Sequence, residues 1–168
     1  MRSWAVFDSP IQNALHTVKY RRNISLADSI AVQMVDFVRS LNWTVNVLIP
    51  APLGAARLRE RGYNQIALVA RPLAYELGLA YAPNGLRKIR ETRSQVGLNI
   101  SQRRENVSQA YQADPSAVER KSILLMDDVA TTGSTISACA EALLSAGARD
   151  VFALTIARAL AHHDLNRV

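Results

Sequence analysis

The sequence has one cysteine and no long apolar run. Cys139 is the single cysteine among 168 residues, which excludes an intramolecular disulfide and a cysteine-rich zinc site. Because it lies among alanines in a helical pattern, we expect a small buried core residue and not a nucleophile. No apolar stretch approaches the roughly 18 residues that span a bilayer. The N-terminus also lacks the apolar core of a secretory signal, so we expect a cytoplasmic protein with no membrane insertion.

Two glycine-rich nucleotide motifs are missing as well. Neither G-x-G-x-x-G nor G-x-x-x-x-G-K-[ST] occurs, which argues against a dinucleotide-binding fold and a P-loop enzyme. Histidine is scarce: we expect His16 on a helix surface, and the pair His162 and His163 lacks a third metal ligand. No residue stands out as a general base, so these absences leave the chemistry of any reaction open.

Positive charge is present in excess and is unevenly distributed. The chain has 20 Lys and Arg against 14 Asp and Glu, and its net charge of +6 is matched by the segment 53–109 alone. A local positive field attracts polyanions such as pyrophosphate, nucleotides or nucleic acid. Arginines on a solvated surface would explain the composition equally well, so charge by itself selects no function.

Strand and helix patterns alternate along the chain. Short apolar runs predict strands, and apolar residues at helical spacing predict helices. The expected strands are 45–49, 122–126 and 151–156. The expected helices are 9–20 with Ser9 as its cap, one near 30–41 capped at Ser25 or Asp28, 64–77 with a disturbance at Pro72, a short one over 101–110, and 134–146. This order predicts an α/β fold with a mostly parallel sheet, as a single domain with a helical hood (1–44) and a core (45–160).

A polar turn links the strand at 122–126 to the helix at 134–146. Asp127 and Asp128 open it, and the remaining residues are Val129, Ala130, Thr131, Thr132, Gly133, Ser134 and Thr135. Ligands bind beyond the carboxyl ends of parallel strands, and the free amides of a helix N-terminus favour phosphate. Glycine permits a positive φ in such a turn. Two carboxylates beside a phosphate are reasonable where they accept hydrogen bonds from two ribose hydroxyls, so the turn predicts a ribose 5-phosphate ligand such as 5-phosphoribosyl 1-pyrophosphate. An acidic strand end before a Ser/Thr helix cap is the plainer alternative.

The segment 123–135 resembles the signature of type I phosphoribosyltransferases. Further landmarks extend a resemblance to the ComF family, which is linked to DNA uptake in natural competence, over nearly the whole chain. These landmarks are LHTVKY at 15–20, IPAP at 49–52, RGYNQ at 61–65, QVGL at 95–98, RRENV at 103–107 and AY at 110–111. The chain departs from the family in lacking its usual four-cysteine zinc module and in placing Pro72 within a helix.

The resemblance implies a type I phosphoribosyltransferase-like fold that binds 5-phosphoribosyl 1-pyrophosphate with Mg²⁺. In it, Asp127 and Asp128 hold the ribose hydroxyls, and residues 131–135 hold the 5-phosphate. The pyrophosphate loop, which often contains a strained peptide bond, corresponds to Pro50, Ala51, Pro52 and Leu53, and a loop that closes over the site corresponds to 86–104. The candidates to grip phosphate are Arg57, Arg61 and Arg93, of which Arg61 and Arg93 join the two aspartates as candidate catalytic residues; exposed surface charge is the alternative for each.

Three hypotheses remain open on the sequence. The chain is a Mg²⁺-dependent phosphoribosyltransferase for an unknown acceptor, a non-catalytic ligand sensor or adaptor, or a module that binds single-stranded DNA within the competence machinery. Stacking platforms for single strands use several aromatic faces, whereas the basic segment offers Tyr63, Tyr75 and Tyr81. We therefore expect DNA binding by this chain to be weak. Whether it forms a homodimer is left open by the sequence.

Overall fold

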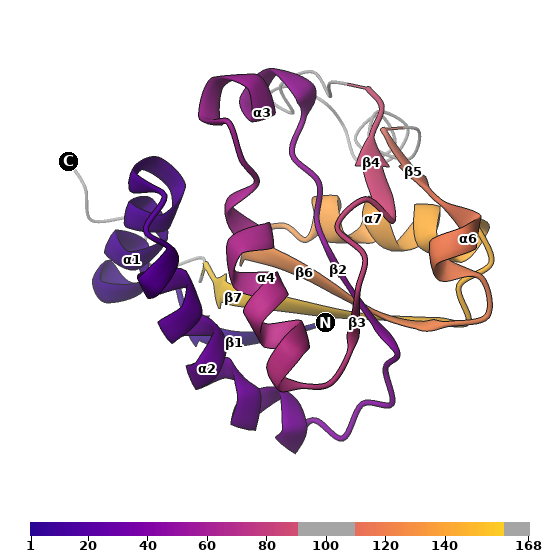
Figure 1. Ribbon diagram of the computed structural model, residues 1–168, viewed down its shortest axis with the longest axis horizontal. Coiled ribbons are helices and arrows are strands. Elements are labelled where there is room, and N and C mark those ends of the chain that lie inside the picture. Colours follow the sequence, from indigo (N-terminus) through magenta and orange to yellow (C-terminus); the bar gives the residue numbers. More distant parts are fainter. Residues whose placement is uncertain (91–109, 160–168) are drawn as a thin grey trace.

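A central parallel sheet organises the chain. The computed structural model describes residues 1–90 and 110–159 (Figure 1). Within them, five strands pair in the order β1-β7-β6-β2-β3, and every neighbouring pair is parallel. The strands are β1 (Arg2–Val6), β2 (Val47–Pro50), β3 (Ala80–Tyr81), β6 (Ser122–Ala130) and β7 (Asp150–Arg158). A separate antiparallel pair joins β4 (Leu86–Lys88) to β5 (Tyr111–Ala113). The α/β fold with a mostly parallel sheet is confirmed.

Helices cover both faces of this sheet. One face carries α1 (Ser9–Arg21), α2 (Ile24–Ser40) and α4 (Gln65–Glu76), and the other carries α6 (Pro115–Val118), α7 (Ser134–Ser145) and the β4–β5 pair (Figure 1). Successive side chains of β6 divide between these layers, because neighbours along a strand point to opposite faces. Leu124 and Met126 pack with the α2 and α4 side, whereas Ile123 and Leu125 pack with the α7 side. All four are fully buried, as expected for a strand covered on both faces.

Several predicted boundaries were wrong. The hood begins with a strand: β1 joins the sheet edge in register with β7, Arg2 opposite Leu154. Asp8, not Ser9, caps α1 by accepting from the Ile11 amide at 3.4 Å. Asn23, not Ser25 or Asp28, caps α2 by accepting from the Leu26 amide at 2.9 Å. In both helices the side chain preceding the first turn satisfies its free amides, which moves the start toward the N-terminus.

The central segment also differs from expectation. Sequence patterns missed α3 (Ala55–Arg61), which buries none of its residues, and missed the pairing of β4 with β5. Helix α4 continues through Pro72. The described backbone contains no cis peptide bond, so the strained bond implied near Pro52 is not of that kind. The short helix expected over 101–110 and most of the expected closing loop lie outside the described residues.

Within the described ranges, no helix combines the length and the apolar character that crossing a bilayer requires.

Candidate functional site

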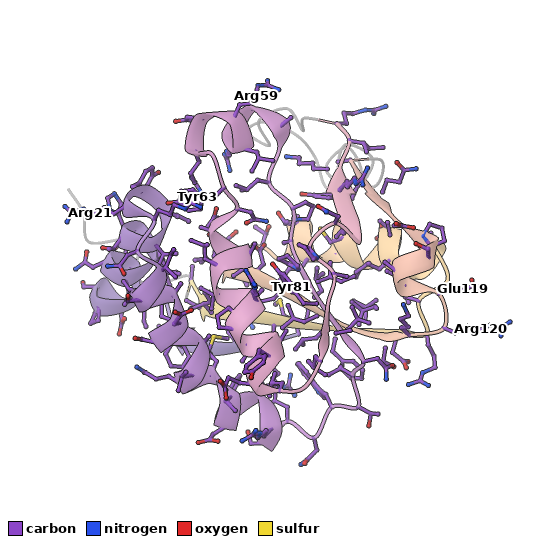
Figure 2. All side chains as sticks on the ribbon, viewed as in Figure 1. Arg21, Arg59, Tyr63, Tyr81, Glu119 and Arg120 are labelled. Atoms are coloured by element: carbon purple, nitrogen blue, oxygen red, sulfur yellow. The ribbon has the colours of Figure 1, made fainter. Side chains whose placement is uncertain are left out.

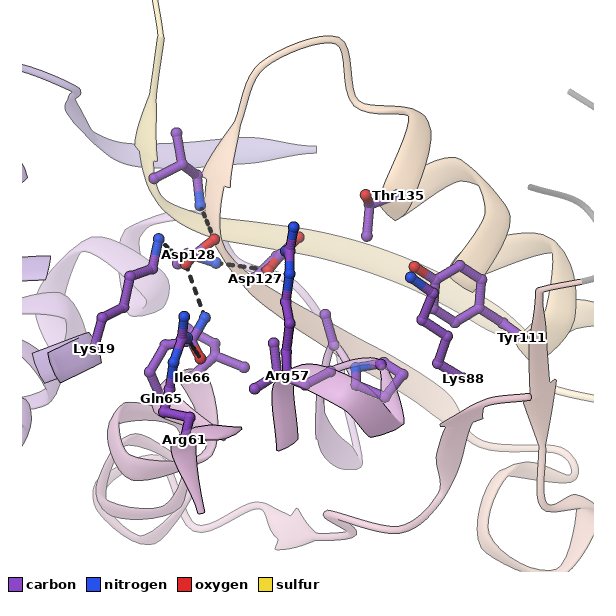
Figure 3. Close-up of a pocket in the computed structure, with 15 residues that line it drawn as sticks. Lys19, Arg57, Arg61, Gln65, Ile66, Lys88, Tyr111, Asp127, Asp128 and Thr135 are labelled. Atoms are coloured by element: carbon purple, nitrogen blue, oxygen red, sulfur yellow. Dashed lines mark hydrogen bonds and ion pairs between the residues drawn. The ribbon is translucent and has the colours of Figure 1, made fainter. Parts of the chain in front are cut away.

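A polar cavity opens at the carboxyl ends of β2 and β6. Its volume is about 330 Å³, and its walls come from α1, the turn after β2, α3, α4, β4, β5 and the end of β6 (Figure 3). Four basic side chains line it together with the acid pair: Lys19, Arg57, Arg61 and Lys88. A smaller hollow of about 90 Å³ adjoins it and is lined by the turn from Asp127 to Ile136. The topology thus gathers four basic side chains from three elements, far apart in the sequence, around two carboxylates.

At the turn before α7, the Ser134 amide donates to Thr132 Oγ1 at 3.4 Å. Gly133 is the N-cap residue and contributes no side-chain cap bond. It has φ +77 and ψ 2, a left-handed conformation that glycine permits. The hydroxyls of Thr132 and Ser134 are 2.8 Å apart. Thr131, Thr132 and Thr135 are exposed, so this turn presents hydroxyls and a positive helix end to the smaller hollow.

The two aspartates lie in the second half of β6, which runs to Ala130 and not to Met126 as predicted. Asp128 is held on several sides: its Oδ2 pairs with Lys19 Nζ at 2.8 Å and accepts from Gln65 Nε2 at 3.0 Å. Its Oδ1 accepts from the Val129 amide at 2.7 Å. Asp127 Oδ1 accepts from the Asp128 amide at 2.9 Å. Both carboxylates are therefore fixed in orientation at the cavity floor (Figure 3).

The paired acids differ in their readiness to take up a proton. Burial, together with the adjacent charge of Asp128, raises the pKa of Asp127 to about 7. Burial would also raise the pKa of Asp128, but the charge of Lys19 and the hydrogen bonds from Lys19, Gln65 and Val129 outweigh it and lower that pKa. Near neutral pH, Asp128 is thus a firmly ionised acceptor, and Asp127 changes its charge with modest changes in pH.

This asymmetry makes folding stability depend on pH through Asp127. Between pH 4 and 7 the folded state holds a proton that the unfolded state has released, so the free energy of unfolding falls as pH rises. Each pKa unit corresponds to about 1.4 kcal/mol; we expect a loss of about 2 kcal/mol from pH 5 to 7. Asp127→Asn should remove this fall in the free energy of unfolding. The stabilising contribution of ionised Asp128 is lost only at lower pH, so it does not affect the comparison. Urea unfolding of both proteins across this range measures the difference; parallel curves would contradict the raised pKa.

Helix α3 supplies two of the four cations. The Arg61 guanidinium donates to Gln65 Oε1 and lies over the Tyr20 ring, 5.3 Å from its centroid. Since Gln65 also donates to Asp128, Arg61 is connected to the acid pair through one side chain. Arg57 lines the same cavity but is exposed. The third candidate arginine, Arg93, lies outside the described residues.

The turn after β2 forms another wall. Ala51, Pro52 and Leu53 line the cavity as expected of a pyrophosphate loop, whereas Pro50 is buried in β2 opposite Met126 and does not line it. The Ala51 amide donates to the Met126 carbonyl at 2.7 Å. Asn64 Nδ2 donates to the Ala51 carbonyl at 2.9 Å. The turn is therefore held against both β6 and the start of α4.

Sequence reasoning missed several lining residues. Lys19, Gln65 and Tyr111 stood in family landmarks without an assigned role, and Lys88 was counted only as charge. The charge of Lys19 and the polarity of Gln65 were the available signals. Their pairing with Asp128 spans 109 and 63 positions, however, and no local pattern shows it. Tyr111 lies beside Thr135 and Cys139, and burial raises the pKa of both the tyrosine and the thiol. Cys139 is fully buried, in agreement with its expected packing role.

Together, the parallel sheet, the acid pair and the turn before α7 define a protein of the phosphoribosyltransferase type. Residues 67–165 match the phosphoribosyl transferase domain family. Because the match covers more than half of the chain, the chain belongs to that family. The similarity of the chain to competence-related proteins confirms its resemblance to the ComF family.

Two curated relatives carry names connected with DNA. The chain is 29% identical over 159 residues to DNA utilization protein YhgH of Salmonella typhimurium, covering 92% of this chain and 70% of that protein. It is 33% identical over 114 residues to Competence protein F of Haemophilus influenzae, covering 67% of this chain and 50% of that protein. The chain thus spans about half of the second relative's length.

Solved structures agree on the fold. Glutamine phosphoribosylpyrophosphate amidotransferase from B. subtilis superposes with a TM-score of 0.52 at 20% identity, covering 77% of this chain and 26% of that one. The adenine phosphoribosyltransferase of Giardia lamblia superposes with a TM-score of 0.51 at 14% identity, covering 82% and 81%. At these identities the likeness establishes the fold and leaves the activity to the site itself.

Proposed function

We propose that this chain binds 5-phosphoribosyl 1-pyrophosphate with Mg²⁺ and transfers its phosphoribosyl group to an acceptor. The observation that carries the proposal is the meeting of three features at the cavity and the hollow that adjoins it: an acid pair, a helix N-terminus and four basic side chains. Their order along the cavity matches the parts of the ligand. The 5-phosphate lies in the turn 131–135, the ribose hydroxyls face Asp127 and Asp128, and the pyrophosphate lies between residues 51–54 and Arg57.

The residues present suit a magnesium ion brought in with the ligand. Mg²⁺ is usually held by one or two carboxylates together with substrate phosphates and water. No group of three or more His, Cys, Asp or Glu gathers in residues 1–90 and 110–159, so a complete protein cage is not what these residues offer. Asp127 and Asp128 supply the hard oxygen donors. The bound ion would neutralise pyrophosphate charge.

The chain's contribution to the reaction is positioning and charge stabilisation. A lone pair of the acceptor forms a bond to the anomeric carbon while the bond from that carbon to pyrophosphate breaks. The bonding electrons leave with pyrophosphate, and any proton on the acceptor atom passes to solvent. Arg57 can stabilise the leaving charge, because a guanidinium group stays ionised and grips phosphate with two donors. The fixed carboxylates keep the sugar in one orientation.

A pyrophosphate-release assay over candidate acceptors tests the transfer step. We expect release that requires both 5-phosphoribosyl 1-pyrophosphate and one acceptor class, and that Arg57→Ala and Arg61→Ala each reduce it. Arg120→Ala, at the far side of the molecule (Figure 2), is the matched control. If the chain binds 5-phosphoribosyl 1-pyrophosphate but releases pyrophosphate with none of the acceptors, the non-catalytic sensor or adaptor is favoured.

A second candidate is binding of single-stranded DNA, and one observation favours it. Arg22 lies 5.6 Å from the centroid of the Tyr63 ring, and Arg61 lies over the Tyr20 ring. These pairs join an exposed Arg22 and a half-buried Arg61 to aromatic faces from segments about 40 positions apart, which the sequence count of aromatics did not reveal. The names of the DNA utilization and competence relatives point the same way.

Salt dependence separates this candidate from the first. Each neutralised phosphate contributes about −0.7 to the slope of log affinity against log salt. If the chain binds a DNA strand through this surface, glutamine in place of Arg21, Arg22 and Arg59 together should change the salt dependence of binding. The slope of log affinity against log salt, measured with a fluorescently labelled oligonucleotide, should become less steep by about 2. The basic run Arg87, Lys88, Arg90 and Arg93 offers a second set for replacement. For the chain alone we expect weak binding; tight binding that survives high salt would place the adaptor ahead of the enzyme.

A further inference from the structure

The two ends of the cavity offer a ligand different chemistry. At one end, beside Thr135, lie Tyr111 and Lys88 (Figure 3). At the other, which we name the hood end, lie Lys19, Arg61, Gln65 and Asp128. Tyr111 is the one aromatic side chain among the described lining residues, so the hood end has cations and an amide but no aromatic lining side chain.

Lys19 is placed at the hood end by the way α1 ends. The hydroxyl of Tyr63 lies 2.8 Å from the carbonyl oxygens of both Val18 and Lys19, to which it donates, and it accepts from the Arg22 amide at 3.1 Å. One side chain from outside the helix thus satisfies backbone groups of its last turn. This fixes the backbone from which the Lys19 side chain reaches Asp128. Lys19 keeps 28% of its side chain exposed in that ion pair, so a ligand can reach it.

Arg61 is fixed in a similar way. Its guanidinium lies over the ring of Tyr20 and donates to Gln65 Oε1. A guanidinium has five N–H donors and an ammonium has three, so both cations can donate further bonds. Lys19 and Arg61 thus offer two cationic donors at the hood end. A neutral base has no charge for these cations to pair, whereas a carboxylate would be paired by them and could accept from both.

We propose that the hood end receives the acceptor and selects one that carries a carboxylate close to its nucleophilic atom. Lys19 and Arg61 bind that carboxylate, while Asp128 stays engaged with Lys19 and Gln65. The inference rests on the proposed function, because it assigns the acceptor side of the same site, and it identifies Lys19 as a determinant of specificity.

Matched acids and amides test the inference. Isothermal titration compares nicotinate with nicotinamide, and orotate with orotamide, against the chain with and without 5-phosphoribosyl 1-pyrophosphate and Mg²⁺. In at least one pair, we expect the acid to bind at least about tenfold more tightly than its amide, a difference typical of one charge-assisted hydrogen bond. Lys19→Met should reduce the preference to less than about threefold, and Lys19→Arg should keep most of it.

The control variant removes charge nearby without touching the cavity. Arg21 is exposed on the same last turn of α1 and does not line the cavity (Figure 2). Arg21→Met should therefore leave the preference unchanged. Equal affinity for acid and amide, no binding of any of the four probes, or a preference that survives in Lys19→Met would each overturn the inference. Failure of 5-phosphoribosyl 1-pyrophosphate to bind is a separate result, which would count against the proposed function.

Discussion

Gly133→Val is expected to weaken binding of 5-phosphoribosyl 1-pyrophosphate by more than a hundredfold. Gly133 has φ +77, a conformation that costs an L-residue roughly 1–2 kcal/mol and a β-branched one more. The valine side chain would also project from the turn that is to receive the phosphate. Losing one or two charge-assisted bonds to phosphate costs about 2–3 kcal/mol of binding free energy, and about 2.7 kcal/mol corresponds to a hundredfold. Titration calorimetry measures the effect.

Gly78→Val is the matched control for this substitution. Gly78 also has a positive φ, +67, and a Cβ there meets nothing within 4 Å. It follows α4, away from the cavity, so the same backbone strain should lower the melting temperature and leave ligand affinity intact. Thr132→Ala, which removes one hydroxyl and introduces no strain, should reduce affinity by about fivefold. Normal binding by Gly133→Val would show that the turn does not wrap a phosphate.

Replacing Asp127 and Asp128 together with asparagine is expected to weaken binding about a hundredfold. Two ribose hydroxyls that donate to charged acceptors contribute roughly 3 kcal/mol in total. The side chains keep their shape, but Asp128 loses its ion pair with Lys19, so a modest fall in the melting temperature accompanies the change. Titration with ligand and a melting curve, recorded on the same protein, separate the two effects.

Asp150→Asn controls for the loss of an ion-paired acid. Asp150 Oδ2 lies 3.0 Å from Arg149 Nε and accepts from the Ser122 hydroxyl, at the end of the sheet opposite the cavity. Its replacement should leave ligand affinity unchanged. Unaltered affinity in the Asp127 and Asp128 double variant, with a cooperative melting transition, would mean that neither carboxylate holds the ribose.

The sequence revealed the parts of the site that are continuous along the chain. The strand at 122–126, the acid pair and the turn with Gly133 are neighbours in sequence, and local rules of strand burial and helix capping predict them. The turn after β2 was implied by the family resemblance, although Pro50 proved to belong to the strand. A continuous segment carries its own spacing, so the sequence alone sufficed.

The missed features depend on contacts between distant segments. Strand β1 has a mixed, half-exposed sequence, and its place is set by pairing with β7, about 150 positions away. Lys19 acquires its role from Asp128, and Tyr63 acquires its role from the end of α1. No local pattern shows such pairs, because each depends on how the helices pack against the sheet. Residues that connect two elements therefore had to be read from the structure.

The central claim is that this chain holds 5-phosphoribosyl 1-pyrophosphate between the acid pair and the turn before α7. Isothermal titration of the chain with that compound, in Mg²⁺ and again in excess EDTA, tests it most directly. We expect saturable binding of one ligand per chain that weakens markedly in EDTA, accompanied by a higher melting temperature in the presence of ligand. The absence of binding heat together with an unchanged melting temperature at millimolar ligand would contradict it.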